Sequence, residues 1–454
     1  MPLTIVSTDD TDGIGLTSGT DLTVLAGVTV SSAGDALDIT SGTYNNGHVT
    51  ILGALVAGNY GIDLDSSLNP SDAVNGSTFY IGSTGQIIAG NIAILMEDGT
   101  TASPIINYGE IFGHNRALFL NSSSAVGAFD IANHGTMSSG ENETVLISNF
   151  NEGSLLNTGM MTNMGGDEVV NQSSGGALDL TNSGTISTNG STAILSFSVA
   201  DIFNSGDILG GITLSIFADV ITNSGLVDGD LTLGNGTDAV ENGGQIYGDV
   251  DLGNDADTYL AVGAGTVSGA ILGGAGEDSI LGGTQADLID GGTEADIIRG
   301  RAGDDVVYGG AGNDTLRTGQ GDDILDGGTG NDFMRGGAGD DVLIGGLGQD
   351  TMFGNAGADT FVFNSASEST NAGAAWDRIM DFDIGQDLID LSAFNARFIG
   401  TAAYAGNGNI AEVRIFADPN GDTRVFVDVN ADGTADMRFY LVNTVGITAE
   451  DFIL

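Results

Sequence analysis

Aspartate recurs at every ninth position between Gly273 and Val362. This segment divides into ten consecutive units of nine residues, each with aspartate at the sixth position and an apolar residue at the eighth. Glycine occupies the first position of nine units and the fourth position of eight. Ten uninterrupted copies of G-G-x-G-x-D-x-U-x exclude a chance pattern. The sixth-position aspartates are Asp278, Asp287, Asp296, Asp305, Asp314, Asp323, Asp332, Asp341, Asp350 and Asp359.

The spacing of these aspartates decides what chemistry they can do. Glycines allow the first six residues of a unit to form a tight turn with inward-facing carbonyls, and the last three form a short strand. Two units would make one coil, so alternate aspartates would stack along the same edge. Carboxylate and carbonyl oxygens are the hard ligands that calcium prefers. We therefore expect all ten aspartates to bind Ca²⁺, with multiple ions in the array.

The alternative is an acidic surface that binds nothing specifically. The segment from Gly273 to Val362 contains 17 carboxylates but only 4 arginines. Stacked aspartates without a cation would therefore repel one another. We therefore expect the array to fold only when calcium is present. The units that begin at Gly282 and Gly291 carry Gln285 and Glu294 at the fourth position, so their sites are expected to be the weakest.

The array resembles the RTX (repeats-in-toxin) proteins of type I secretion. The resemblance implies a parallel β-roll with calcium in its turns, which folds at the calcium concentration outside the cell. Residues 376–383 and 385–392 look like the segment that follows the repeats in the serralysin group of secreted metalloproteases. The terminal residues 450–454 are similar to the uncleaved export signal of that group. The resemblance implies export by a type I secretion transporter of a Gram-negative bacterium and a secreted, extracellular location.

Other features of the chain agree with this expectation. Its first residues have neither a basic n-region nor an apolar h-region, so we expect no cleaved secretory signal there. No stretch of eighteen apolar residues occurs, so we expect no membrane insertion. The chain has no cysteine, which leaves bound metal rather than disulfides to stabilise it outside the cell. Its net charge of -51 would repel phosphate backbones and anionic lipids, so nucleic acid is excluded as a partner.

The first 270 residues follow a looser period. An Asn-x-Gly motif recurs every 19 to 26 residues, often before a short apolar segment, and this predicts a parallel β-helix. The asparagines would stack as a ladder, each amide bonding to the next coil. The motif begins at Asn107, Asn133, Asn157, Asn182, Asn204, Asn223 and Asn242. Residues 234–238 and 253–257 already resemble the nonapeptide turns.

We therefore predict an all-β fold in three parts. A parallel β-helix-like solenoid over residues 1–270 would run into a calcium-binding RTX β-roll over residues 271–365. A small β region over residues 366–454 would form the serralysin-like secretion region. Within it, Asp428, Asn430, Asp432, Gly433 and Asp436 match the start of an EF-hand loop, but Phe439 stands where that loop needs glutamate. We interpret this loop as a β-hairpin turn between residues 425–427 and 438–441, with a calcium site as the alternative.

The chain carries few recognisable catalytic motifs. Neither H-E-x-x-H nor G-x-S-x-G occurs, which excludes the motifs of a zinc protease and a lipase. His114 and Arg116 stand near Glu110 and could form a small polar site, but we interpret them as part of a solvated turn between coils. The carboxylate pairs Asp63/Asp65 and Glu97/Asp98 could in principle serve a glycosidase. Nothing distinguishes either pair from the other carboxylates.

The sequence thus favours a non-enzymatic extracellular protein with a surface, matrix or adhesin-like role, whose partner is an extracellular glycan or a cell surface. The alternative is a polysaccharide-acting enzyme (lyase, epimerase or hydrolase) with its site on the N-terminal β-helix. An enzyme should show carboxylates clustered with Arg116 in a concave site, whereas an adhesin should show an edge of repeated Thr, Asn and Ser.

Overall fold

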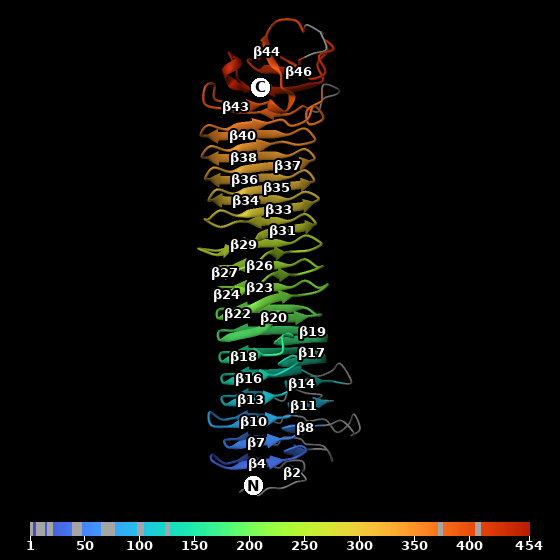
Figure 1. The fold of residues 1–454 in the computed structure, drawn as a ribbon, viewed down its shortest axis with the longest axis vertical. Coiled ribbons are helices and arrows are strands. Elements are labelled where there is room, and N and C mark those ends of the chain that lie inside the picture. The colour runs from blue at the N-terminus through green and yellow to red at the C-terminus, as the bar shows by residue number, and fades with distance from the viewer. Residues whose placement is uncertain are drawn as a thin grey trace. The chain divides into compact units, whose positions relative to one another are not determined.

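The computed structural model describes residues 3–5, 14–15, 21–38, 48–64, 78–97, 104–122, 128–370, 376–404 and 410–454. The chain forms two compact units, Met1–Asp249 and Val250–Leu454. Each unit is a parallel β-solenoid in which successive strands stack on one another (Figure 1). The all-β solenoid prediction is confirmed, while the predicted boundaries after residues 270 and 365 stay a prediction.

Unit 1 has three columns of parallel strands, so its coils are three-sided. The first column contains β1 (Leu3–Ile5), β3 (Leu22–Val24), β6 (His48–Ile51), β9 (Thr78–Ile81), β12 (Ile105–Asn107), β15 (Ala128–Asn133), β17 (Val145–Asn157), β19 (Val170–Asn182), β21 (Ala200–Asn204), β23 (Val220–Asn223) and β26 (Ala239–Asn242). The second contains β4 (Thr29–Ser32), β7 (Ala54–Ala57), β10 (Gln86–Ala89), β13 (Glu110–Gly113), β16 (Thr136–Ser139), β18 (Met160–Asn163), β20 (Thr185–Ser196), β22 (Asp207–Thr213), β24 (Leu226–Asp228) and β27 (Gln245–Ile246). The third contains β2 (Ile14–Gly15), β5 (Leu37–Asp38), β8 (Ile62–Leu64), β11 (Ile92–Glu97), β14 (Arg116–Asn121) and β25 (Leu231–Thr232), joined by parts of β17, β19, β20 and β22.

The predicted asparagine ladder is present at one corner of unit 1. Asn157 is fully buried, and its Nδ2 donates to Asn182 Oδ1 at 2.8 Å while its own Oδ1 accepts from Asn133 Nδ2 at 2.8 Å. The same bond links every successive pair from Asn107 to Asn242, at 2.8–2.9 Å. The amides thereby satisfy one another in the core, where an unpaired amide would be costly.

Unit 2 has two columns of parallel strands, so its coils are flat and two-sided. One column contains β28 (Val250–Asp251), β31 (Ala270–Ala275), β33 (Leu288–Thr293), β35 (Val306–Ala311), β37 (Ile324–Thr329), β39 (Val342–Ile344), β41 (Thr360–Val362), β43 (Leu388–Asp390) and β48 (Phe452–Ile453). The other contains β29 (Thr258–Ala261), β32 (Ser279–Leu281), β34 (Ile297–Ala302), β36 (Thr315–Gln320), β38 (Phe333–Ala338), β40 (Thr351–Ala356), β42 (Arg378–Ile379) and β47 (Met437–Leu441). A further short strand is β30 (Thr266–Val267).

Three strands of the repeat array, β32, β39 and β41, have the three residues predicted, but the others are longer. β34, for example, covers six residues, from the seventh position of one unit to the third position of the next. The difference arises because the glycines of the following turn continue the parallel pairing: Gly292 pairs with Gly310, and Gly310 with Gly328. The eighth-position side chains form the core as predicted, and all ten, from Ile280 to Phe361, are at most 1% exposed.

The C-terminal part of unit 2 adds an antiparallel sheet. β45 (Glu412–Ala417), β46 (Thr423–Asp428) and β47 pair in antiparallel fashion, and β44 (Arg397–Gly400) extends the sheet beside β45. The predicted hairpin is therefore confirmed, with Val425 opposite Phe439. Two 3-10 helices, η1 (Ser392–Phe394) and η2 (Ala449–Asp451), complete the unit. Over the described ranges the chain forms no α-helix, and no helix there is long and apolar enough to cross a membrane.

Candidate metal centre

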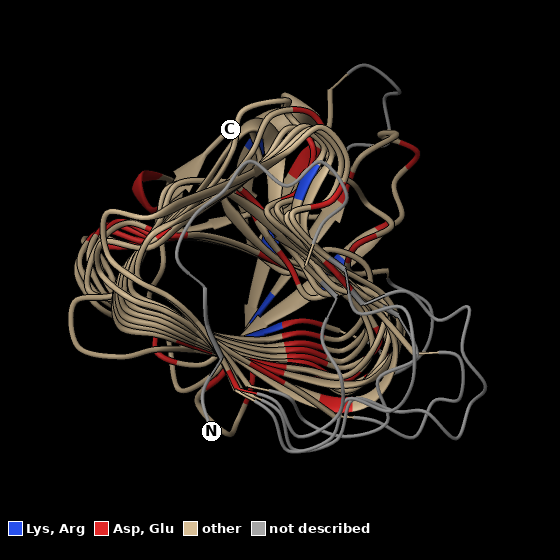
Figure 2. Cartoon of the chain, turned by 90° about the horizontal axis from the view of Figure 1, so that it is seen from below, with Lys and Arg blue, Asp and Glu red and all other residues tan. Residues whose placement is uncertain are grey.

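The ten sixth-position aspartates lie in two hydrogen-bonded ladders along the turns of unit 2. The backbone N–H of one aspartate donates to Oδ1 of the aspartate 18 residues later, at 2.8–3.0 Å. All ten side chains are buried, and Figure 2 shows acidic residues, in red, recurring at the same place in successive coils. One ladder contains Asp278, Asp296, Asp314, Asp332 and Asp350; the other contains Asp287, Asp305, Asp323, Asp341 and Asp359.

The second carboxylate oxygen of these aspartates faces a small space beside the first-position glycine. Asp314 Oδ2 is buried and has no hydrogen-bond partner among the described residues. A Cβ atom placed on Gly309 would lie 2.6 Å from this oxygen and 2.7 Å from the carbonyl oxygen of Gly327 in the next coil. Gly291 and Gly327 show the same arrangement. Each such space, which we call a cradle, therefore brings one carboxylate oxygen and one carbonyl oxygen together.

Two of the ten repeats differ from the others in what occupies this space. Asp287 Oδ2 accepts a hydrogen bond from the backbone N–H of Gly283 at 2.7 Å, so this oxygen is already engaged. Asp323 has Thr318 at the first position of its unit instead of glycine. The Thr318 side chain is fully buried and its Oγ1 donates to the carbonyl oxygen of Gly336 at 3.2 Å. A side chain therefore occupies the space that glycine leaves open elsewhere.

Both ladders continue beyond the nonapeptide array, which spacing alone did not indicate. The N–H of Asp350 donates to Asp377 Oδ1 at 2.9 Å, and the N–H of Asp359 to Asp387 Oδ1 at 3.0 Å. These steps span 27 and 28 residues rather than 18, so a nine-residue pattern misses them. In unit 1, the N–H of Asp219 likewise donates to Asp238 Oδ1 at 2.7 Å. The nonapeptide-like residues 234–238 are the sequence signal that could have identified this rung.

Burial dominates the electrostatics of the ladders. Desolvation, and then the neighbouring carboxylates, raise the pKa of Asp296, Asp305, Asp332 and Asp341 to about 7. The same causes raise the pKa of Asp359 to about 6. Burial also raises the pKa values of Asp278, Asp287, Asp314, Asp323 and Asp350. A nearby divalent cation would act in the opposite direction by favouring the ionised carboxylates.

The donor set fits calcium. Calcium takes six to eight oxygen ligands in flexible geometry, and carbonyl oxygens serve as well as carboxylates. Within the part of the chain that the structure describes, no three His, Cys, Asp or Glu side chains lie together as a metal cluster. Each aspartate must therefore act with backbone carbonyls. The cradles offer that combination, because an otherwise unsatisfied carboxylate oxygen and a carbonyl oxygen lie beside the same space.

Comparison with protein families agrees with this geometry. Residues 270–298 and 290–325 match the family model described as the RTX calcium-binding nonapeptide repeat. The RTX array is followed by a second match: residues 328–454 fit the Peptidase M10 serralysin C-terminal model. Together these regions indicate a calcium-binding protein of type I secretion and an extracellular location, as the sequence predicted.

Comparisons of the whole chain add less. No curated protein matches it. Among solved structures, the AlgE6R3 subunit of the mannuronan C5-epimerase from Azotobacter vinelandii is 27% identical. The match covers 37% of this chain and 78% of that chain, with a TM-score of 0.18. A TM-score this low carries no conclusion about the shared fold or function.

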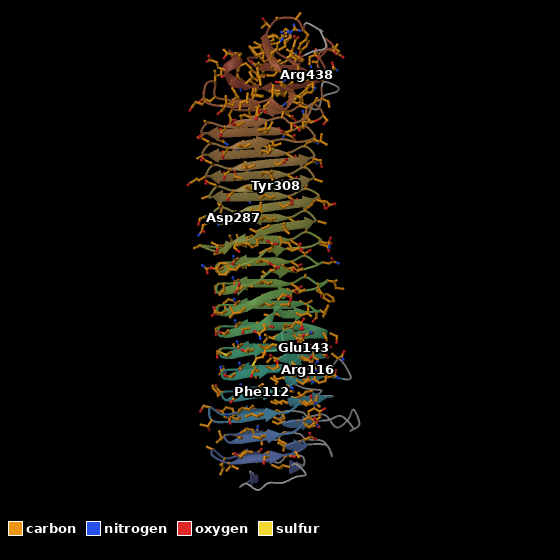
Figure 3. The ribbon with its side chains drawn as sticks, viewed as in Figure 1. Phe112, Arg116, Glu143, Asp287, Tyr308 and Arg438 are labelled. Carbon is orange, nitrogen blue, oxygen red and sulfur yellow. The ribbon has the colours of Figure 1, made fainter. Side chains whose placement is uncertain are left out.

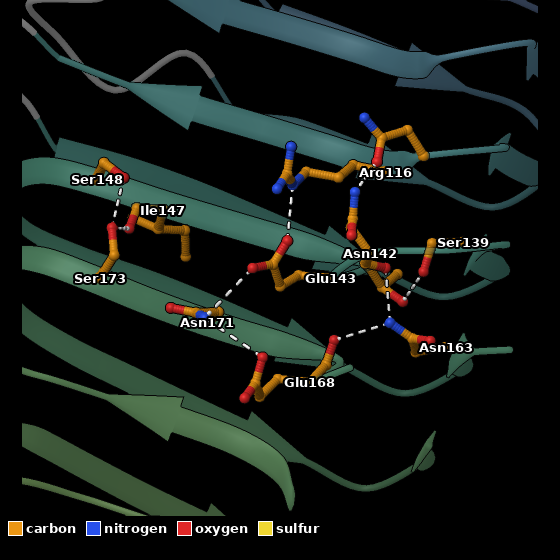
Figure 4. Close-up of polar contacts among 12 residues, drawn as sticks. Arg116, Ser139, Asn142, Glu143, Ile147, Ser148, Asn163, Glu168, Asn171 and Ser173 are labelled. Atoms are coloured by element: carbon orange, nitrogen blue, oxygen red, sulfur yellow. Dashed lines mark hydrogen bonds and ion pairs between the residues drawn. The ribbon is translucent and has the colours of Figure 1, made fainter. Parts of the chain in front are cut away.

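The polar residues singled out in unit 1 do not come together. His114 pairs with Glu141 at 3.3 Å. Arg116 Nε pairs with Glu143 Oε2 at 2.8 Å (Figure 4). Glu110 instead accepts from Gln86 Nε2 at 2.8 Å. The small polar site considered for His114, Arg116 and Glu110 does not form among the described residues, because the coil directs each side chain to a partner in a neighbouring coil.

The other candidate carboxylates of unit 1 lie only partly within the described residues. Asp63 is buried on β8, whereas Asp65 and Asp98 lie outside the described residues. A groove of about 310 Å³ lies near β10 and β13. Gln86, Tyr108, Glu110 and Thr136 are among the residues that line it, but Arg116 is not.

The carboxylates of the Asp428–Asp436 loop accept hydrogen bonds from the backbone N–H groups of the same loop. Both carboxylate oxygens of Asp428 accept backbone N–H groups, from Asp432 at 3.1 Å and Gly433 at 2.8 Å. Asp436 Oδ2 accepts from the N–H groups of Val429 and Asn430 at 2.9 and 3.1 Å. These bonds are those of a turn that connects β46 and β47, which favours the hairpin interpretation over a calcium site.

Proposed function

We propose that the cradles of the RTX array are the calcium sites of this protein. Each ion would be held by an aspartate Oδ2, by the first-position carbonyl of the next coil and by further turn carbonyls. The observation that carries the proposal is the convergence of a buried, unpartnered Asp314 Oδ2 on the Gly327 carbonyl across a space left by Gly309. All ten aspartates line such turns, but the sites of Asp287 and Asp323, where a protein contact already engages one of the oxygens, would stay empty at calcium concentrations that fill the others.

Calcium binding would make folding conditional on the compartment. Without a cation, the ladders bury stacked carboxylates. Desolvation and mutual repulsion both oppose the ionisation of these carboxylates. Binding free energy then becomes folding free energy, so the array would fold once the chain meets calcium outside the cell. A type I transporter would thus pass an unfolded chain, and extracellular calcium would complete the fold.

Unit 1 would provide the surface for a non-enzymatic, adhesin-like or matrix role. The middle residue of the Asn-x-Gly corners is an exposed hydroxyl in four successive coils, Thr158, Ser183, Ser205 and Ser224. The ladder of buried asparagines beneath fixes the height of each coil. A regular edge of small hydroxyl groups suits repeated polar contacts with an extracellular glycan or a cell surface.

The experiment combines calcium counting with a binding screen. Equilibrium dialysis of the full chain should show several bound ions, and fewer in the Asp314→Ala, Asp332→Ala double variant. A panel of extracellular polysaccharides is then tested for binding and for product formation. Binding without turnover supports the proposal, whereas turnover of any polysaccharide contradicts its non-enzymatic part.

An enzyme that acts on polysaccharides is the second candidate, and one observation favours it. The groove beside Tyr108 is concave and contains the carboxylate of Glu110, held by Gln86. If a polysaccharide is turned over, the Glu110→Gln variant should lose that activity. Retained activity in this variant would remove the groove as the active site.

A further inference from the structure

The outward face of the antiparallel sheet carries an alternating pattern of arginine and aromatic side chains. Arg414 on β45 lies opposite Phe426 on β46, which lies opposite Arg438 on β47. In the next row the pattern is inverted: Phe416 on β45 lies opposite Arg424 on β46, which lies opposite Tyr440 on β47. We call the six residues of these two rows the arginine–aromatic face.

The guanidinium groups of this face stack on rings. Arg414 Cζ lies 4.1 Å from the ring centroid of Phe416, and Arg438 Cζ lies 3.4 Å from that of Trp376. Figure 3 locates Arg438 within this C-terminal sheet. Stacking holds a guanidinium flat while its N–H edge remains available to a carboxylate.

The arginines are poorly neutralised by their own chain. The Nε atoms of Arg414, Arg424 and Arg438 are buried and have no hydrogen-bond partner among the described residues, so a carboxylate of a second copy could reach only the Nη groups. Over the same residues, the one ion pair of the face joins Arg424 to Asp418 at 3.2 Å. The chain has 61 acidic residues but only 10 basic ones, so three arginines on one small face are a local exception.

A complementary surface exists on the RTX array of the same unit. The fifth-position residues Asp304, Asp322 and Asp340 are exposed and stacked in successive coils on one edge. The N–H of Asp322 donates to Asp304 Oδ1 at 3.0 Å, and the N–H of Asp340 to Asp322 Oδ1 at 2.8 Å, which fixes the column. We call these three residues the acidic column. No ion pair between the column and the face occurs within the described chain.

The two surfaces have matching spacing because both are set by β-pairing. Neighbouring strands lie about 4.8 Å apart, so Arg414 and Arg438, two strands apart, are separated by roughly 9.6 Å. Asp304 and Asp340 are two coils apart and are separated by about the same distance. Two arginines can therefore meet two aspartates at once, with Asp322 opposite the aromatic residue between them.

We propose that the arginine–aromatic face of one chain docks on the acidic column of a second copy. The contact joins different surfaces of the two copies, so it leaves one free face and one free column and can continue as an open assembly. Six residues are fewer than a standard interface uses, so each contact is weak and association depends on concentration. The inference rests on the proposed matrix role and gives it a physical basis.

The test is a charge exchange in the full chain with saturating calcium. Sedimentation velocity over a range of concentrations should show wild-type association that weakens with salt, because exposed charges are screened. Arg414→Glu with Arg438→Glu should raise the concentration of half-association by more than about tenfold. Asp304→Arg with Asp340→Arg should do the same. A mixture of the two double variants should associate again, because the acidic face of the first variant can then dock on the basic column of the second.

The matched control is Asn313→Arg with Asn331→Arg, which changes the fifth position on the opposite edge and should leave association unchanged. Circular dichroism in calcium shows that each variant is folded. A wild-type chain that stays monomeric, or one that associates regardless of both charge reversals, overturns the inference. An intact calcium response in the same samples would show that the proposed calcium function survives that result.

Discussion

Thr318 Oγ1 donates a hydrogen bond to the carbonyl oxygen of Gly336 at 3.2 Å, in the space that glycine leaves open at the first position of the other nine repeats. The hydroxyl thereby engages one of the two oxygens that would hold calcium beside Asp323. Because the bond is made by the protein itself, this rung of the ladder is stabilised without an ion.

The first prediction follows from this contact. Thr318→Gly should open the cradle and raise the number of bound calcium ions by one. Gly309→Thr should lower the number by one, since threonine would then fill the cradle of Asp314. Equilibrium dialysis at saturating calcium measures both numbers. Equal stoichiometry in wild type and Thr318→Gly would contradict the cradle as the binding site.

The second prediction concerns the charge of a single ladder residue. Asp314→Asn keeps the Oδ1 acceptor for the N–H of Asp296 but removes the charge that calcium needs. The calcium concentration at half-folding should rise by at least about tenfold for that site, as even outer-shell changes weaken metal binding to this extent. Glu277→Gln is the control, because it removes one exposed charge from the same array and should change little. Equal shifts in both variants would mean that only net charge matters.

The third prediction addresses the asparagine ladder of unit 1. Asn157→Ala leaves Asn133 Nδ2 and Asn182 Oδ1 without their buried partner, which should cost about 1–3 kcal/mol of local stability. Hydrogen exchange of peptides from β15 and β19 should accelerate. Ser183→Ala, an exposed change at the same corner, should leave exchange unaltered. If the two variants exchange alike, the ladder does not stabilise the coils.

The fourth prediction is a pH dependence in unit 1. Burial raises the pKa of Asp219 from 3.8 to about 7. The folded state therefore binds more protons than the unfolded state between these values. Its contribution to stability is full below pH 4 and is lost as pH rises through 7. Asp219→Asn should therefore be more stable than wild type at pH 8 and similar at pH 4.

Hydrogen exchange of β21 at the two pH values measures this difference. Asparagine retains the acceptor for the N–H of Ala200, which Asp219 Oδ1 binds at 2.6 Å. A variant that is less stable than wild type at pH 8 would show that the ionised carboxylate is favourable in the fold.

Periodicity made most of the fold predictable. Asn107 to Asn242 and Asp278 to Asp359 each recur at the length of a coil or half a coil, so stacking follows from counting residues. The eighth-position core and both aspartate ladders follow from the same count. The hairpin between β46 and β47 was predictable from its turn residues and flanking apolar strands.

The remaining features depend on contacts that spacing does not encode. Asp377 and Asp387 join the ladders after loops of irregular length, and His114 and Arg116 find separate partners in adjacent coils. The blocked cradle at Thr318 requires knowledge of which oxygens face the first position. The arginine–aromatic face appears only when the antiparallel register of three strands is known.

Circular dichroism of the full chain during a calcium titration, with magnesium as the control, tests the central claim most directly. The account predicts a cooperative gain of β-signal with calcium but not with magnesium, because the cradles combine carboxylate and carbonyl oxygens in a flexible arrangement. Full β-signal in chelator, unchanged by calcium, would contradict it, since the carboxylate ladders would then stack without metal.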